Sequence, residues 1–275
     1  MVKTENQMNK QKIITVANQK GGVGKTTITM NLGTALAKKG NRVLLIDSDP
    51  QANLTSYFGR ETEHTLDEVY LSKKLPSKDS ALQMITTTEN GLPDILAADK
   101  SLSGVDYFLL SRSNRQMVLR QFLDQLTAEY DFILVDTPPS LNLLTVNALV
   151  ASHYVLIPVQ SEFFSLEGIV KMRELIEEVK KDWNPRLELL GVLQSQVTSR
   201  RRLTSDVEQI LKGELGKKLF KSRIRNTAAI TESTGHGCSV IDYSSSSNGS
   251  KDFLDFTDEV IMRVNEYSEK GIQLL

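Results

Sequence analysis

The stretch KGGVGKTT, residues 20–27, decides how this chain folds. A run of aliphatic and β-branched residues, 13–17, precedes it and predicts a buried strand. A helical apolar pattern follows over residues 26–39 and ends near Gly40. A glycine-rich turn between a strand and a helix can direct backbone N–H groups and the positive end of the helix dipole at one anion. The stretch therefore predicts a phosphate-binding loop.

The loop departs from the usual pattern G-x-x-x-x-G-K-S/T at its first position, where Gln19 replaces glycine. The remaining residues still suit a nucleotide with Mg²⁺. We expect Lys25 to neutralise β- and γ-phosphate charge, Thr26 to ligate Mg²⁺ and Thr27 to reach the α-phosphate. Lys20 adds a second positive charge at the mouth of the loop, which favours an anion there. The predicted nucleotide-binding residues are Lys20, Gly21, Gly22, Val23, Gly24, Lys25, Thr26 and Thr27.

Acidic residues follow two further strand-like runs. Asp47 and Asp49 end the run RVLLIDSD, and Asp136 ends FILVD. The carboxyl ends of parallel strands meet at one edge of a sheet, so these side chains should share an edge with the loop. We expect Asp136 to hold Mg²⁺ through water. Of the other two aspartates, one can order the metal's water shell and the other can position the attacking water, although both also suit turns and helix caps.

The rest of the chain alternates strand-like and helix-like segments. This alternation predicts an α/β fold with a doubly wound, mostly parallel twisted sheet flanked by helices, in one P-loop ATPase domain over residues 1–275. Within it we expect a flexible extension at residues 1–11, an irregular helical insertion at 60–110 and a C-terminal helix at 251–270. The other predicted strands are 42–47, 132–136, 154–159 and 188–193, and the clearest other helices are 116–129 and 166–181.

Composition narrows the possible functions. The single cysteine, Cys238, excludes a disulfide within the chain and disfavours thiolate zinc or iron–sulfur sites. The N-terminus is polar, which is unlike a signal peptide, and no apolar run reaches the roughly 18 residues of a membrane span. These features predict a cytoplasmic protein. The net charge of −1 gives no indication of nucleic-acid binding by the whole chain.

One segment of the chain is far more positively charged than the whole chain. Residues 200–225 hold nine basic and three acidic residues, a local charge of +6, which leaves −7 for the remainder of the chain. A basic patch on an acidic body is typical of proteins that bind the phosphate backbone of nucleic acid. A solvated charged surface is the other interpretation of the same pattern.

Taken together, these motifs resemble the deviant Walker-A ATPases of the ParA/MinD superfamily, and among them the ParA-type DNA partition ATPases. The strings VANQKGGVGKTT, DSDPQANLT, VDTPPSLNLLTVNAL and VLIPVQSEFFSLEGI occur in the expected order. The resemblance implies a homodimer that sandwiches two ATP molecules, with Lys20 reaching the partner's nucleotide. It implies that Lys20, Lys25 and Asp49 are catalytic, and that Asp47 acts on the metal through water. Hydrolysis should be slow until a dimer or an activator completes the site.

The resemblance also implies partners. These are nonspecific DNA, a ParB-like centromere-binding protein that stimulates hydrolysis, and hence a nucleoid-associated location. The DNA-binding residues expected from the basic segment are Arg200, Arg201, Arg202, Lys221 and Arg223. Relatives often read PRNVRLSEAP where this chain has residues 224–233, and their second arginine is absent here at Ala228 or Ala229. A MinD-like membrane-surface positioning ATPase is the alternative. The weakly basic C-terminal helix favours a packed helix and no membrane partner.

Overall fold

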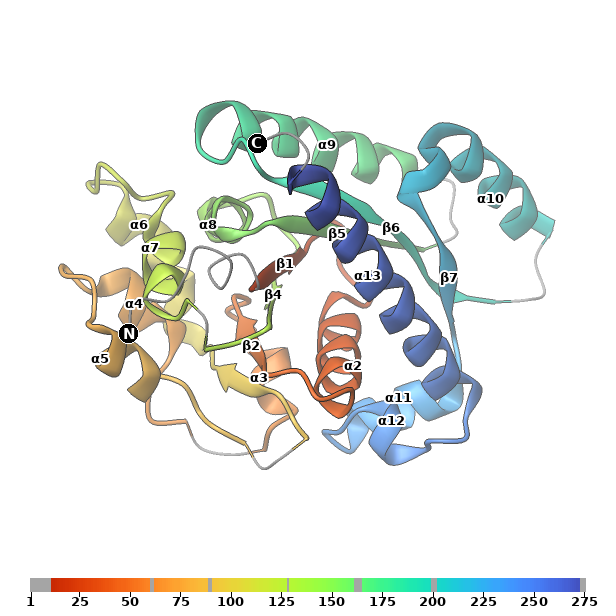
Figure 1. The fold of residues 1–275 in the computed structure, drawn as a ribbon, viewed down its shortest axis with the longest axis horizontal. Helices are drawn as coiled ribbons and strands as arrows, with labels where there is room; N and C mark the ends of the chain where they lie inside the picture. Colours follow the sequence, from red (N-terminus) through yellow and green to blue (C-terminus); the bar gives the residue numbers. More distant parts are fainter. Residues whose placement is uncertain are drawn as a thin grey trace.

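The computed structural model describes residues 11–59, 62–88, 91–127, 129–160, 165–198 and 202–272. Within these residues a single parallel sheet has seven strands in the order β3-β2-β4-β1-β5-β6-β7 (Figure 1). The strands are β1 (Lys12–Val16), β2 (Val43–Asp47), β3 (Asp94–Leu96), β4 (Phe132–Asp136), β5 (Tyr154–Gln160), β6 (Glu188–Val197) and β7 (Leu219–Arg225). The chain leaves β1 in both directions along the sheet, so the prediction of a doubly wound parallel fold is confirmed.

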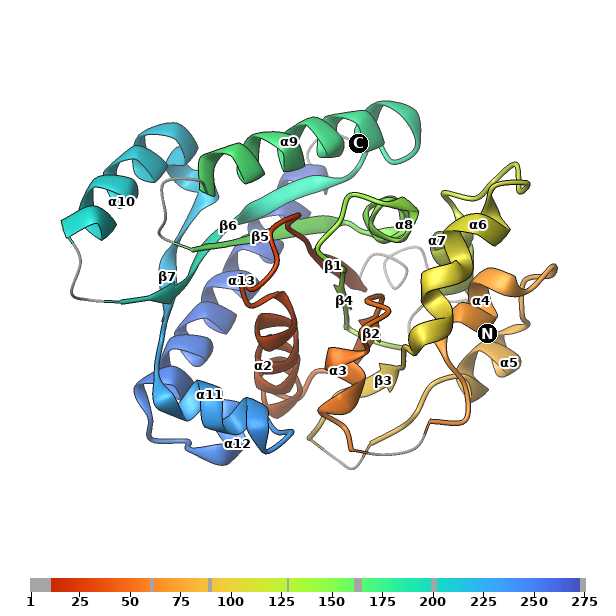
Figure 2. The same ribbon diagram turned by 180° about the vertical axis from the view of Figure 1, so that it is seen from behind.

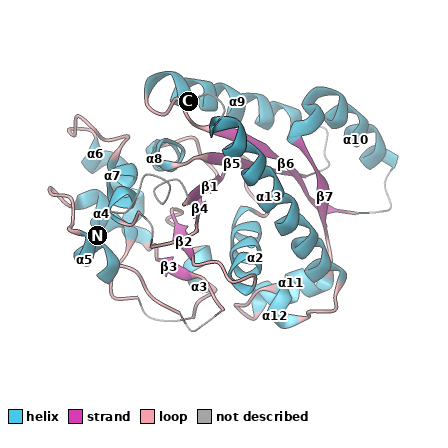
Figure 3. Cartoon of the chain, in the orientation of Figure 1, coloured by secondary structure: helices cyan, strands magenta, loops and turns pink. Residues whose placement is uncertain are grey.

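Helices cover both faces of the sheet (Figures 1, 2 and 3). The α-helices are α2 (Lys25–Lys38), α3 (Asn53–Ser56), α4 (Leu66–Leu71), α5 (Lys78–Gln83), α6 (Val105–Leu109), α7 (Val118–Gln125), α8 (Leu143–Ala151), α9 (Ser165–Asp182), α10 (Arg202–Leu215), α11 (Ala228–Gly235), α12 (Val240–Tyr243) and α13 (Asn248–Ile272). Two 3₁₀ helices, η1 (Lys100–Gly104) and η2 (Gly216–Lys218), complete the set within the described ranges.

Strand β1 shows how the core is divided. Ile14 and Val16 pack with α2 and α13 on one face, whereas Ile13 packs with α7 and α8 on the other. Alternate side chains of a strand point to opposite faces, so a strand covered on both sides is apolar throughout. This is why residues 13–17 have the uninterrupted pattern of a buried strand. Figure 2 shows α9 in front of the sheet and α13 behind it.

Most predicted elements lie where the sequence places them, and two strands were not predicted. The strands β1, β2, β4 and β5 match within one residue, and β6 continues to Val197 instead of ending at residue 193. Strand β3 was missed because it has only three residues and follows Pro93. It lies inside residues 60–110, so that region supplies one edge of the sheet. Strand β7 was missed because its polar residues 221–223 interrupt the apolar pattern.

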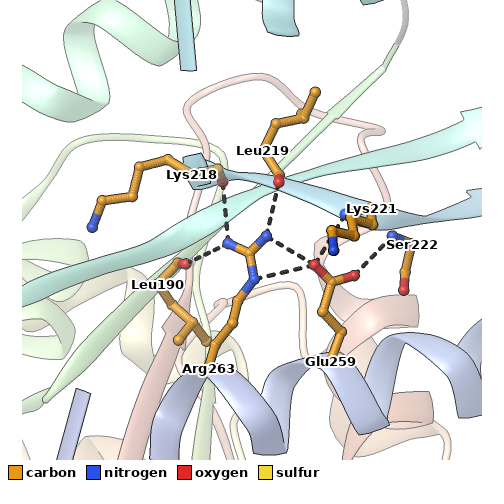
Figure 4. A network of polar contacts seen from close by, with 7 residues as sticks. All are labelled: Leu190, Lys218, Leu219, Lys221, Ser222, Glu259 and Arg263. Atoms are coloured by element: carbon orange, nitrogen blue, oxygen red, sulfur yellow. Dashed lines mark hydrogen bonds and ion pairs between the residues drawn. The ribbon is translucent and has the colours of Figure 1, made fainter. Parts of the chain in front are cut away.

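Helix α13 closes the other edge of the sheet (Figure 4). The Glu259 carboxylate accepts hydrogen bonds from the backbone N–H groups of Lys221, at 3.0 Å, and Ser222, at 2.8 Å. Arg263 donates to Glu259 and to the carbonyl of Leu219, both at 2.8 Å. Side chains of α13 thus satisfy polar groups of the outermost strand, which an exposed edge would offer to another chain. Nowhere in the described ranges is a helix long and apolar enough to cross a membrane.

Candidate nucleotide-binding site

The loop between β1 and α2 has the backbone geometry of an anion cradle. Gly22 and Gly24 have φ angles of 74° and 83°, in the left-handed region where glycine is favoured. Gly24 is the N-cap of α2, and no described side chain caps this helix. The first N–H groups of α2 are therefore directed at the space above the loop, with the positive end of the helix dipole behind them. The structure places all eight predicted loop residues, 20–27, at this position.

Polar side chains outside the motif hold the loop in shape. Asn18 Oδ1 accepts a hydrogen bond from the backbone N–H of Lys20 at 3.0 Å. The carbonyl of Gly22 accepts from Gln160 Nε2 at 3.0 Å and from Gln196 Nε2 at 2.7 Å. The two glutamines come from the carboxyl ends of β5 and β6, and Gln196 itself has a φ of 52°. Sequence analysis missed them, although polar residues that end apolar strands beside a ligand edge are a usable signal.

The predicted metal ligands meet directly. Thr26 Oγ1 donates a hydrogen bond to Asp136 Oδ2 at 2.6 Å. Asp136 is fully buried, and its Oδ1 has no hydrogen-bond partner among the described residues. Burial raises the pKa of Asp136 well above its ordinary value, the charge of Asp47 raises it further, and Thr26 and Lys25 lower it. A buried carboxylate oxygen without a donor suits a cation, and Mg²⁺ often binds one protein carboxylate with nucleotide phosphates. The residues present therefore fit the metal.

Asp47 holds the turn that carries Asp49. Its carboxylate accepts hydrogen bonds from the backbone N–H of Asp49 at 3.1 Å, and from the backbone N–H and Oγ1 of Thr55, each at 2.8 Å. It lies opposite Asp136 in the register of β2 and β4. Burial raises the pKa of Asp47 to about 6, against the lowering effect of the bonds from Thr55. The sequence predicts that Asp47 acts on the metal through water. The structure shows in addition that the Asp47 carboxylate holds the turn that carries Asp49 through these hydrogen bonds.

The catalytic candidates line or flank one cavity of about 650 Å³. Asp49 and Lys25 lie in its wall, and Asp49 Oδ1 accepts a hydrogen bond from the backbone N–H of Gln51 at 2.9 Å. Lys25 Nζ donates to the carbonyl of Lys20 at 3.4 Å. Burial lowers the pKa of Lys25, while Asp136 and Asp49 raise it. The lysine is thus held beside carboxylates at the place where phosphate charge would sit.

A second cavity of about 280 Å³ adjoins the first and shares Gly24 and Thr27 with it. Its other walls come from β7, α11 and α13, and include Ile224, Asn226 and Phe253. The apolar side chains can pack against a heterocyclic base, and the amides of Gln196 and Asn226 with the neighbouring hydroxyl groups can hydrogen-bond to its polar edge. Sequence analysis named no base-contacting residue, because this wall is assembled from segments that are far from the loop in the chain.

The predicted DNA-binding residues are only partly within the described structure. Arg200 and Arg201 lie outside the described residues, and Arg202 begins α10 without a described side chain. Lys221 and Arg223 are exposed on β7. Arg225 belongs to the same basic segment, and its guanidinium forms an ion pair with the Asp252 carboxylate of α13 at 2.6 Å. The effective positive charge of this surface is therefore smaller than the sequence count.

The chain is similar to known proteins over most of its length. Residues 11–189 match a family model described as an AAA domain. The chain is 39% identical to the chromosome partitioning protein ParA of Caulobacter vibrioides over 268 aligned residues. The aligned region covers 96% of this chain and 98% of the relative. It is also 39% identical to the sporulation initiation inhibitor protein Soj of Bacillus subtilis over 251 aligned residues. This aligned region covers 90% of this chain and 98% of the relative. The fold is also similar to a solved structure from Mycobacterium smegmatis, named cobyrinic acid a,c-diamide synthase, which holds ADP and magnesium. The TM-score is 0.77 and the sequence identity is 32%, over 90% of this chain and 93% of that chain.

Proposed function

The chain belongs to the ParA/Soj family of partition ATPases, and on that premise we propose that it is an ATP-switched partition protein for plasmid or chromosome segregation. It is an ATPase, and its ligands are ATP and Mg²⁺. The observation that carries the proposal is the convergence of the uncapped N-terminus of α2, the Thr26–Asp136 pair and Asp49 on one cavity edge. ATP binding would drive dimerisation, the dimer would bind DNA, and a ParB-like partner would stimulate hydrolysis.

The residues of the cavity suit phosphoryl transfer, which depends on positioning and charge stabilisation. The backbone N–H groups of the loop and Lys25 would hold the phosphates. Asp136 and Thr26 would hold Mg²⁺, which when bound supplies charge neutralisation at the phosphate oxygens. Asp49 would orient the attacking water and accept its proton. Asp47 would keep Asp49 in place through the bonds described above and act on the metal through water.

The dimer proposal rests on Lys20. Its backbone is fixed on both sides, because the N–H donates to Asn18 and the carbonyl accepts from Lys25. The side chain is half-buried at the mouth of the loop. We propose that it reaches the nucleotide of a second copy of the chain. No arginine lines the described wall of the phosphate cavity, so hydrolysis by the isolated subunit should be slow.

The DNA proposal concerns the surface around α10 and β7. Lys221 and Arg223 are exposed there, and α10 begins at Arg202, directly after Arg200 and Arg201. Lysine and arginine side chains on such a surface would contact phosphates, so binding should be independent of sequence and weaken steeply with salt. Binding to chromosomal DNA would make a cytoplasmic protein nucleoid-associated.

The alternative is a membrane-surface positioning ATPase. Such a protein needs an amphipathic helix whose apolar face is available to lipid. The apolar side chains of α13, namely Phe253, Phe256, Val260 and Val264, are instead buried in the main core. This packing favours the DNA-binding function.

Co-sedimentation separates the two functions. Purified protein is mixed with random duplex DNA or with vesicles of anionic phospholipid, each with ATP and with ADP, over a range of salt concentrations. ATP-dependent and salt-sensitive binding to DNA supports the proposal. Binding to vesicles without binding to DNA would refute it and support the membrane function.

A further inference from the structure

Two adjacent residues at the end of β6 hold two adjacent peptide units of the phosphate-binding loop. Ser195 Oγ donates a hydrogen bond to the carbonyl of Val23 at 2.8 Å, the shorter of its two hydrogen bonds. Gln196 Nε2 donates to the carbonyl of Gly22 at 2.7 Å. Gln160, at the end of β5, donates from its Nε2 to the same Gly22 carbonyl at 3.0 Å and to Gln196 Oε1 at 2.8 Å. These three side chains therefore fix two consecutive carbonyl groups of the loop.

A β-bulge allows both residues of β6 to reach the same loop. Neighbouring side chains of a regular strand point to opposite faces of the sheet. Gln194 of β6 pairs with Arg223 of β7, and Val197 pairs with Arg225, so three steps along β6 match two steps along β7. One extra residue is therefore inserted in β6, and Gln196 within this stretch has a φ of 52°. Bulges occur beside active sites, where they redirect a side chain.

The backbone of Gln196 would suit glycine better than glutamine. Its φ of 52° lies in the left-handed region, which residues with a side chain populate sparsely and which glycine adopts without a steric penalty. The side chain is exposed and lines both the phosphate cavity and the adjoining cavity, so burial in the core does not require a glutamine here. A strained residue in the wall of a binding site indicates that its side chain has a function there.

The direction of each loop carbonyl also sets the direction of the next N–H group. A trans peptide unit is planar, so its C=O and N–H bonds point in opposite directions. The Gly22 carbonyl shares its peptide unit with the Val23 N–H, and the Val23 carbonyl shares its unit with the Gly24 N–H. Because β5 and β6 hold the two carbonyls on their own side, these N–H groups point away from the two strands. Backbone N–H groups of such a loop bind the α- and β-phosphates of a nucleotide.

We propose that Gln196 is a positioning residue for nucleotide binding, because its amide holds the Gly22 carbonyl and thereby orients the N–H groups of the loop toward the phosphates. Gln160 acts together with it, since its hydrogen bond to Gln196 Oε1 leaves Gln196 Nε2 facing the loop. The inference rests on the proposed role of residues 20–27 in phosphate binding. ATP and ADP share the α- and β-phosphates, so the amide acts equally on the binding of both nucleotides.

The test is the variant Gln196→Met, which removes the amide and keeps a side chain of similar length. We expect Kd for ATP and Kd for ADP to rise equally, by about fivefold to tenfold, the effect of losing one neutral hydrogen bond. KM for ATP should rise in the same way while kcat is unchanged, because the ground state and the transition state lose the same binding. Tm without nucleotide should change by less than about 2 °C, since the side chain is exposed. A merely structural glutamine would change Tm and leave both Kd values unchanged.

Gln209→Met is the matched control, because it is the same substitution at an exposed position of α10 that lines neither cavity. It should leave both Kd values unchanged. A second variant, Gln196→Gly, separates the amide from the backbone: glycine suits the φ angle but has no amide, so both Kd values should rise as in Gln196→Met. The losses of binding in Gln160→Met and Gln196→Met should not add in the double variant, since residues that act as a unit are not additive.

Three outcomes would overturn the inference. Unchanged Kd values in Gln196→Met would show that the loop keeps its geometry without the amide. Normal binding of ATP by Gln196→Gly would show that only the backbone conformation matters. A loss confined to ATP or to kcat would place the amide on the γ-phosphate or the attacking water instead. Lys25→Ala tests the loop separately: if it binds ATP normally, the proposed role of the loop is wrong, and if it fails to bind ATP while Gln196→Met binds normally, only the inference about Gln196 is wrong.

Discussion

Asp136→Asn should make the nucleotide-free protein more stable while it abolishes hydrolysis. Asp136 is fully buried beside Asp47, and each carboxylate lies in a site where burial raises its pKa. An asparagine keeps an oxygen that can accept the hydrogen bond from Thr26 and removes one buried negative charge. Hydrolysis should fall by about 100-fold or more, because the metal loses its charged ligand.

The size of the effect follows from the surroundings of Asp136 itself. Burial is the largest cause that raises its pKa well above the ordinary value, and the charge of Asp47 is the next, so the ionised carboxylate destabilises the folded protein. Asparagine cannot ionise, and we expect a gain of about 1–3 kcal/mol in the free energy of unfolding at pH 7. For a chain of this size the gain would raise Tm by about 2–5 °C.

The pH dependence gives this prediction its sign. A carboxyl whose folded-state pKa is raised binds its proton more tightly in the folded protein. For Asp136 the penalty is therefore absent below pH 3.8 and grows as pH rises from 3.8 towards the raised pKa of the folded protein. Asp136→Asn should remove this contribution to the fall in stability above pH 3.8.

Urea unfolding at pH 4 and at pH 7, without nucleotide or Mg²⁺, measures the effect. Asp131→Asn is the matched control, because Asp131 precedes β4 and its carboxylate accepts a hydrogen bond from the backbone N–H of Arg42 at 2.9 Å. The control should give no gain in stability. A lower stability of Asp136→Asn at pH 7, or an equal gain at pH 4 and pH 7, would refute the argument from charge.

Three further predictions concern other parts of the molecule. Lys20→Ala should retain ATP binding, measured with a fluorescent ATP analogue, but lose the rise of specific ATPase rate with protein concentration; an unchanged rise would exclude Lys20 from the dimer site. Arg263→Met should lower the free energy of unfolding by about 3–5 kcal/mol, because it leaves the buried Glu259 carboxylate without its positively charged partner, and the double variant with Glu259→Met should recover part of that loss. Replacing Lys221 and Arg223 together by alanine should weaken binding to any duplex DNA and reduce the slope of log affinity against log salt by about 2; an unchanged slope would place the DNA surface elsewhere.

The sequence by itself determined the loop, its strand and helix, and the identity of the main carboxylates. These features are local: the glycines at residues 21, 22 and 24 and the lysine and threonines after them act through neighbouring backbone. The apolar run before Asp136 predicts its strand, and the parallel sheet then brings it to the edge that carries the loop. The local apolar pattern predicts the strands, and the carboxyl ends of parallel strands share one edge of the sheet. These two arguments are sufficient to predict this part of the site.

Only the tertiary structure decided what surrounds that site. Gln160 and Gln196 hold the loop from strands that are more than a hundred residues away. Strands β3 and β7 are recognisable as strands only beside their neighbours, because three residues or an alternating charged run carry too little pattern. Such contacts depend on how separate elements pack in space, which is the physical reason that local pattern could not supply them.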